Sequence, residues 1–104
     1  MSGRTLRQCA SFVRSKNAGP FTITIDIFFE TQADFRMAVL SAALTPEAVG
    51  PLYGVDPGDI RRFAVEQALA IKFSLPRPVA AGDFGDRDVA GGQQFAPLLD
   101  LVLE

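Results

Sequence analysis

The sequence is poor in the side chains that move protons and bind metals, since it contains no histidine, no tryptophan, one cysteine and one tyrosine. Histidine is the commonest general base near neutral pH and the commonest metal ligand, so its absence removes many enzyme classes. Cys9 alone cannot form a zinc site of the usual spacing or a Cys-His nucleophile pair. Any catalytic residue would have to be a carboxylate, a lysine, the tyrosine or Cys9.

An excess of positive charge and long apolar runs are also absent. The formal net charge is -2, which leaves no surplus to neutralise a phosphate backbone, so nucleic acid is not expected as a partner. Asp26, Lys72 and Asp100 interrupt the apolar stretches, which fall short of the roughly 20 residues that span a bilayer. The lone cysteine and the absence of a signal-peptide core at the start predict a cytoplasmic protein.

The composition that remains is typical of a folded globular protein. Hydrophobic residues make up 48% of the 104 positions and charged residues 21%. A chain of this length forms one domain, and we therefore expect residues 1–104 to fold as a single unit.

Residues 21–29 give the clearest strand. Phe21, Ile23, Ile25, Ile27 and Phe29 share one face, and Thr22, Thr24, Asp26 and Phe28 occupy the other. Further strands are predicted at 6–10, 60–65, 68–75 and 97–103, with a hairpin at residues 66–67. Residues 14–20 and 76–94 are predicted as loops, because polar and turn-forming residues are concentrated there.

Two helices are predicted between these strands. Thr31 is a suitable N-cap for a helix that runs to Leu44, with Asp34 at its third position. Thr45 followed by Pro46 and Glu47 signals a second, short helix, which we expect Gly50 and Pro51 to interrupt. The pattern predicts an α+β fold: a ferredoxin-like variant with a mostly antiparallel sheet of four to five strands and one or two helices packed on one face.

A cationic segment is the first candidate site. It combines two cations, a hydroxyl, an amide and a glycine: Arg14, Ser15, Lys16, Asn17 and Gly19. Arginine binds carboxylate or phosphate through parallel hydrogen bonds, lysine adds a point charge, and glycine lets backbone amides come close. The segment therefore predicts an anion-binding loop, and the alternative is a solvated turn.

Other polar residues are weaker candidates for a site or an interface: Lys72, Arg77, Asp83, Asp86, Gln93 and Gln94. The aspartates do not have the ligand spacing of a calcium loop, so no metal is expected. No nucleotide-binding fingerprint is present, and we expect no cofactor. Lys72 would be a base if it were buried, but a solvent-facing lysine on a sheet is the simpler interpretation.

Several segments carry a resemblance to a family of small uncharacterised bacterial proteins. These are Arg14-Ser15-Lys16-Asn17-Ala18-Gly19-Pro20-Phe21, Leu44-Thr45-Pro46-Glu47, Leu52-Tyr53-Gly54-Val55, Ala68-Leu69-Ala70-Ile71-Lys72 and Leu75-Pro76-Arg77-Pro78. That family is similar in turn to the ferredoxin-fold domain of AtuA-like proteins of acyclic terpene utilisation. In that domain an Arg-Ser-Gly-Asp-Lys-Gly loop follows the first strand, and Arg14-Ser15-Lys16 resembles a shorter version without the acid.

The resemblance implies an accessory small subunit of a heteromeric catabolic enzyme. Its partner would be an AtuA-like large subunit, and the substrates would be acyl-CoA or carboxylic acid metabolites. Two other functions stay open. One is a stand-alone, homo-oligomeric lyase or hydratase that pairs Lys72 or Tyr53 with Asp83 or Asp86 across an interface. The other is a structural oligomerisation module that uses exposed strand edges.

Overall fold

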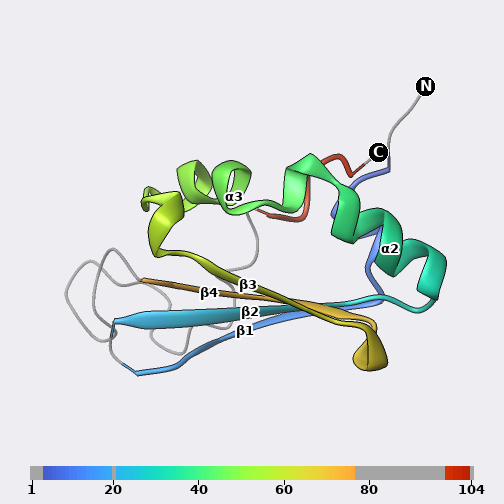
Figure 1. Ribbon diagram of the computed structural model, residues 1–104, viewed down its shortest axis with the longest axis horizontal. Helices are drawn as coiled ribbons and strands as arrows, with labels where there is room; N and C mark the ends of the chain where they lie inside the picture. The colour runs from blue at the N-terminus through green and yellow to red at the C-terminus, as the bar shows by residue number, and fades with distance from the viewer. Residues whose placement is uncertain (1–3, 20, 77–97, 104) are drawn as a thin grey trace.

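The computed structural model describes residues 4–19, 21–76 and 98–103, and its centre is one antiparallel sheet. The strands are β1 (Phe12–Asn17), β2 (Thr22–Phe28), β3 (Arg61–Val65) and β4 (Ala70–Pro76), in the order β1-β2-β4-β3. Two helices, α2 (Gln32–Leu40) and α3 (Pro46–Tyr53), lie on the same side of the sheet (Figure 1). The predicted α+β class is confirmed, and the arrangement is compatible with a ferredoxin-like variant.

The central strand β2 is built as its alternation predicts. Ile23, Ile25 and Ile27 are almost fully buried on the side that faces the helices. Each such side chain contributes roughly 1.5 to 3 kcal/mol as an upper estimate, so a register shift of one residue is strongly disfavoured. Phe21 precedes the strand and is exposed, which corrects its predicted place among the buried residues.

The core lies between the sheet and the helices. Ile71, Phe73 and Leu75 of β4 complete the buried side of the two central strands. The helices contribute Phe35 and Val49 to the same cluster. Among the described residues, the helices α2 and α3 cover this side of the sheet, and the opposite side carries most of the polar side chains of the strands.

The first predicted helix begins where expected and ends early. The Thr31 hydroxyl oxygen accepts from the Asp34 N–H at 3.1 Å, as its sequence position predicts. The α-helix stops at Leu40, and Ser41 then caps a 3-10 turn, η1 (Ala42–Leu44), by accepting from the Ala43 N–H. The single predicted helix is therefore two helical segments, because the Ser41 side chain offers the backbone a local hydrogen bond.

The second predicted helix has its expected cap, but Gly50 and Pro51 do not interrupt it. Thr45 accepts from the Ala48 N–H at 3.2 Å, and α3 continues to Tyr53, where Gly54 ends it with a φ of 67°. Pro51 removes only one backbone donor from a helix that is capped at both ends. Gly50 has a packing role, since a Cβ there would lie 2.7 Å from the Val55 carbonyl oxygen.

The predicted first and last strands are wrong. Residues Leu6–Cys9 form a short helix, α1, whose Gln8 side chain accepts from the Thr5 N–H at 2.8 Å in the manner of a capping box. The described part of the C-terminal segment, residues 98–103, forms no strand; it makes an isolated bridge from Val102 to Thr5 and backbone hydrogen bonds to residues 4–7. In residues 6–9 the capping box favours a helix, and in residues 98–103 the backbone pairing is too short for a strand. In both segments these effects outweigh the apolar pattern that predicted a strand.

The predicted hairpin between β3 and β4 is confirmed. The two strands pair from Arg61 with Ser74 to Val65 with Ala70. The connection is a 3-10 turn, η3 (Glu66–Ala68), followed by Leu69 in the left-handed conformation, and β4 therefore begins two residues later than predicted. None of the helices in the described part of the chain is long and apolar enough to cross a bilayer.

The close approach at Gly50 gives a stability prediction. We expect Gly50→Ala to lower the free energy of unfolding by about 1 to 3 kcal/mol, because the added methyl group meets a backbone oxygen and Pro57 at 3.2 Å. Gly58→Ala is the matched control, since its Cβ would meet only the Asp56 side chain, at 3.4 Å. Urea unfolding of the two variants checks this, and equal midpoints would contradict it.

Candidate functional site

The open face is the side of the sheet opposite α2 and α3, and the strand register arranges it in rows. One row aligns Phe12, Phe28, Ala70 and Val65; the middle row aligns Arg14, Asp26, Lys72 and Phe63; the end row aligns Lys16, Thr24, Ser74 and Arg61. Neighbouring strands lie about 4.8 Å apart, so charges within a row interact directly across the strands. Four cations and one carboxylate therefore share this face.

Asp26 is the centre of the middle row. Its side chain is only 4% exposed, although it belongs to the open face. The Arg14 Nε donates to the Asp26 Oδ2 at 2.9 Å, and the Lys72 Nζ lies 3.9 Å from the Oδ1. A buried carboxylate is strongly disfavoured unless it is paired, and here one cation on each neighbouring strand provides the pairing.

Aromatic rings hold the arginine of this row in place. The Arg14 guanidinium lies 5.4 Å from the centroid of the Phe28 ring, and Phe28 in turn packs on Phe12 at 5.8 Å. A cation above an aromatic face is attracted by the ring quadrupole. Phe28, which is unusual as an apolar residue on the polar side of its strand, thus orients Arg14 towards Asp26.

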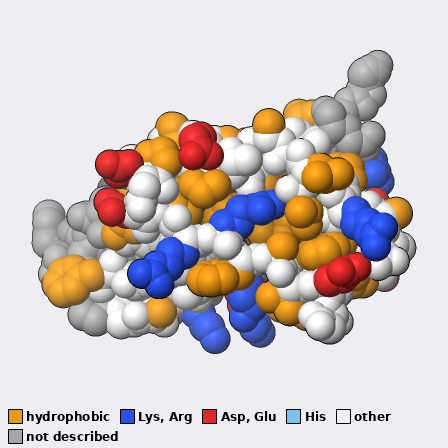
Figure 2. Space-filling model, in the orientation of Figure 1, with side chains coloured by type: hydrophobic (Ala, Val, Ile, Leu, Met, Phe, Trp, Pro, Cys, Tyr) orange, Lys and Arg blue, Asp and Glu red, His pale blue; other side chains and the backbone are white. Residues whose placement is uncertain are grey.

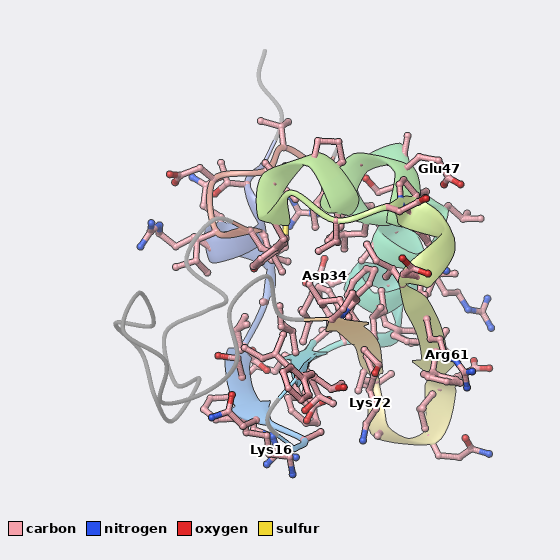
Figure 3. The ribbon with its side chains drawn as sticks, turned by 90° about the vertical axis from the view of Figure 1, so that its left-hand side faces the viewer. Lys16, Asp34, Glu47, Arg61 and Lys72 are labelled. Atoms are coloured by element: carbon pink, nitrogen blue, oxygen red, sulfur yellow. The ribbon has the colours of Figure 1, made fainter. Side chains whose placement is uncertain are left out.

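The end row differs from the middle row because its cations are not paired. Lys16 on β1 and Arg61 on β3 flank the hydroxyls of Thr24 and Ser74. In the described part of the chain neither cation forms an ion pair. Figure 3 shows Lys16 and Lys72 projecting away from the helices on the same side of the sheet, and Arg61 projecting from its outer edge.

A polar pocket of about 320 Å³ adjoins this end row. It is lined by Thr22, Asp59, Arg61, Ser74, Leu75 and Pro76. The pocket thus offers a guanidinium, two hydroxyls and a carboxylate. A guanidinium can bind a ligand carboxylate or phosphate, while the Asp59 carboxylate can accept from a ligand hydroxyl or amine.

The structure divides the predicted anion-binding loop between two faces. Arg14 to Asn17 are part of β1, so the predicted loop at these positions is wrong, and pairing with β2 overrides the low strand propensity of this segment. Arg14 and Lys16 lie on the open face. Ser15 is buried on the helix side opposite Ile25, and Asn17 shares that side. Gly19 lies in the following turn with a φ of 105°.

The other predicted residues divide between the open face and the undescribed part of the chain. Lys72 lies on the open face and is 47% exposed, which fits the solvent-facing interpretation. Five predicted residues lie outside the described residues: Arg77, Asp83, Asp86, Gln93 and Gln94. Tyr53 is on α3, on the opposite side of the sheet from Lys72, and the predicted partners of either side chain, Asp83 and Asp86, are among these undescribed residues.

Sequence reasoning missed Asp26, Arg61 and Ser74 as members of the site. A signal for Asp26 was present, because it is the only charged residue in an otherwise apolar and threonine-rich strand. Its cationic neighbours could not be assigned, since they come from strands whose pairing register is a tertiary property. The same holds for the pairing of Arg61 with Ser74.

The middle row predicts the effect of removing its carboxylate. We expect Asp26→Ala to lower the free energy of unfolding by about 1.5 to 3 kcal/mol, because Arg14 and Lys72 lose their common acceptor. Arg14 and Lys72 are partly exposed, so the loss of stability is expected to be smaller than the roughly 3 to 5 kcal/mol that breaking a fully buried ion pair costs. Asp100→Ala is the control, since its 3.4 Å pair with Arg7 is exposed. Chemical unfolding measures both, and an unchanged midpoint for Asp26→Ala would contradict the prediction.

The single tyrosine provides a pH prediction. Burial raises the pKa of the Tyr53 hydroxyl well above its ordinary value of 10.0. A group with a raised folded-state pKa stabilises the fold fully below its unfolded pKa, and this contribution decreases as the pH rises above about 10. We expect the tyrosinate absorbance of the native protein to appear at higher pH than that of the urea-unfolded protein. Coincident titration curves would show that the hydroxyl is accessible.

Comparisons with known proteins place the chain in one family. No curated protein and no solved structure matches the chain. A family model described as a domain of unknown function, DUF4387, matches residues 6–102, which include all four strands and the complete open face. The chain therefore belongs to the DUF4387 family.

Proposed function

We propose that this chain is an accessory subunit that binds an anionic metabolite on its open face, next to an AtuA-like large subunit. The end row is the observation that carries the proposal. Lys16 and Arg61 flank two hydroxyl side chains there, and neither cation is neutralised by a carboxylate of the described residues. The Thr24 hydroxyl donates to the Lys16 carbonyl oxygen at 3.5 Å, so unpaired cations beside the Ser74 hydroxyl form a site that favours an anion.

The polar pocket supports a carboxylic acid as the bound group. Arg61 can hold a carboxylate through two parallel hydrogen bonds, and the Ser74 and Thr22 hydroxyls can donate to the same group. Asp59 would repel a second acid but can accept from a hydroxyl. A hydroxy acid, or an acyl-CoA whose phosphates contact Lys16, combines these features.

The chemistry of the open face supports an accessory role. Asp26 is the buried carboxylate of the site, and it is already engaged by Arg14 and Lys72. The sequence has no histidine that could transfer a proton in its place. Under this proposal the small subunit binds and orients the anion, and the large subunit contributes the groups that perform the reaction.

Binding of defined anions tests the site. Isothermal titration with malate and with coenzyme A compares the chain with Lys16→Gln and Arg61→Gln. We expect each substitution to weaken binding of at least one probe by about 1.5 to 3 kcal/mol, or roughly 10- to 150-fold in Kd, because it removes a charge-assisted hydrogen bond. Arg7→Gln is the control, since Arg7 is an exposed arginine in α1 that pairs with Asp100. Equal affinities for all three variants would reject the end row as an anion site.

Co-expression tests the accessory role separately. The chain is produced with an AtuA-like large subunit, and the two are expected to co-purify and to convert a carboxylic acid or acyl-CoA substrate only together. Turnover by the isolated chain would contradict the proposal and favour a stand-alone lyase or hydratase. A homo-oligomer that binds neither anion nor large subunit would favour a structural module.

A further inference from the structure

The outer edge of the sheet at β3 has no backbone partner among the described residues. β3 pairs with β4 on one side only, and the strand order ends at β3. No other described segment forms backbone hydrogen bonds with Arg61–Val65. An exposed edge presents unpaired N–H and C=O groups that another extended chain can pair with.

An apolar groove of about 400 Å³ follows this edge on the helix side. It is lined by Phe35, Arg36, Val39 and Leu40 of α2, by Ala64 of β3 and by Glu66. Leu40 is 85% exposed, and Ala64 faces the groove side because it is aligned with the buried Ile71. Figure 2 shows hydrophobic side chains gathered below α2 and bordered by charged ones. A strand added beside β3 would direct every second side chain into this groove.

Arg62 lies on the same side of β3 as Ala64, two residues away. One of its guanidinium nitrogens donates to the Val39 carbonyl oxygen at 2.9 Å. Its Nε is buried and has no acceptor, and no carboxylate of the described residues pairs with it. Burial lowers the pKa of Arg62, which is the response expected of a desolvated cation without a counter-charge. The residue as a whole is only partly buried, so a carboxylate from outside can approach the guanidinium and supply the counter-charge that the described residues do not provide.

We propose that the β3 edge and the groove bind an extended segment of a partner protein, which adds a fifth strand to the sheet. The segment carries an acidic side chain opposite Arg62 and an apolar side chain beside Ala64 and Leu40. Arg62 and Ala64 are two residues apart on one face of β3. The two side chains of the partner are therefore also two residues apart, because every second side chain of a strand lies on the same face.

Charge complementarity argues against a second copy of this chain that pairs through the same β3 edge. Its β3 edge consists of Arg61, Arg62, Phe63, Ala64 and Val65 and has no carboxylate. Pairing of two such edges would add two further arginines and no carboxylate, and would leave Arg62 without an acidic acceptor. A helix would leave the backbone groups of the edge unpaired, so an extended acidic segment fits best.

The inference does not depend on the anion site. The groove lies on the helix side of the sheet, and the end row lies on the open face. Variants in the groove are therefore expected to leave the affinities for malate and coenzyme A unchanged. The two proposals can fail independently.

Nuclear magnetic resonance of the isotopically labelled chain tests the docking site with short synthetic peptides. The probe is Thr-Val-Thr-Glu-Thr with blocked ends, in which valine precedes glutamate so that an antiparallel strand places them opposite Ala64 and Arg62. The comparison peptides are Thr-Val-Thr-Lys-Thr and Thr-Ser-Thr-Glu-Thr. We expect amide shifts confined to β3 and α2. The glutamate-valine peptide should bind at least about tenfold more tightly than either comparison peptide, because only it supplies both contacts.

Variants identify the contacts. Arg62→Gln should abolish the preference for glutamate over lysine, and Leu40→Asp should weaken binding of the glutamate-valine peptide at least about tenfold. Leu52→Asp is the matched control, an exposed leucine of α3 that should have no effect. The same spectra show whether each variant is folded, and Leu40 is too exposed for its substitution to disturb the core.

Four outcomes would overturn the inference. They are no binding at millimolar peptide, equal affinity for the glutamate and lysine peptides, shifts that fall on the open face, and insensitivity to Leu40→Asp. A dimer detected by sedimentation that Leu40→Asp dissociates would also overturn it, since it would assign the edge to a second copy.

Discussion

Asp26 lies in the middle of the sheet, and its carboxylate is buried between Arg14 and Lys72 on the two neighbouring strands. This contact and the isoleucines on the other side of β2 require the same register. A shift by one residue would move the carboxylate into the core and the isoleucines towards water. The charges and the hydrophobic core therefore specify one arrangement of β1, β2 and β4 together, and the positions of all other open-face residues follow from it.

The same register places the paired charges of the open face in the middle row and the unpaired cations in the end row. In the middle row Asp26 neutralises its neighbours, and Phe28 holds Arg14 in place. In the end row Lys16 and Arg61 flank hydroxyls instead of a carboxylate. A stable ion pair thus lies beside cations that have no counter-charge in the described residues. An overall charge of -2 conceals this local excess of positive charge, because Asp26 is the only acid among the described residues of the three rows.

The helix side and the open face present different surfaces to other molecules. The open face combines cations with hydroxyls and a polar pocket, and this suits a small anion. The β3 edge combines backbone groups that no described residue pairs with, an apolar groove and Arg62, and this suits an extended segment of protein. The proposed accessory role would use both kinds of surface, one for the ligand and one for the partner. Two faces of one small sheet are sufficient to provide them.

The sequence by itself determined the α+β class, the central strand, the β3-β4 hairpin and the N-caps at Thr31 and Thr45. These depend on alternation and on side chains that bond to their own backbone, which are local properties. Only the tertiary structure decided that Arg14 to Asn17 form a strand, that α3 continues through Pro51, and that Asp26 meets two cations. Each of these depends on contacts between residues distant in sequence, whose burial and pairing free energies outweigh the local preferences.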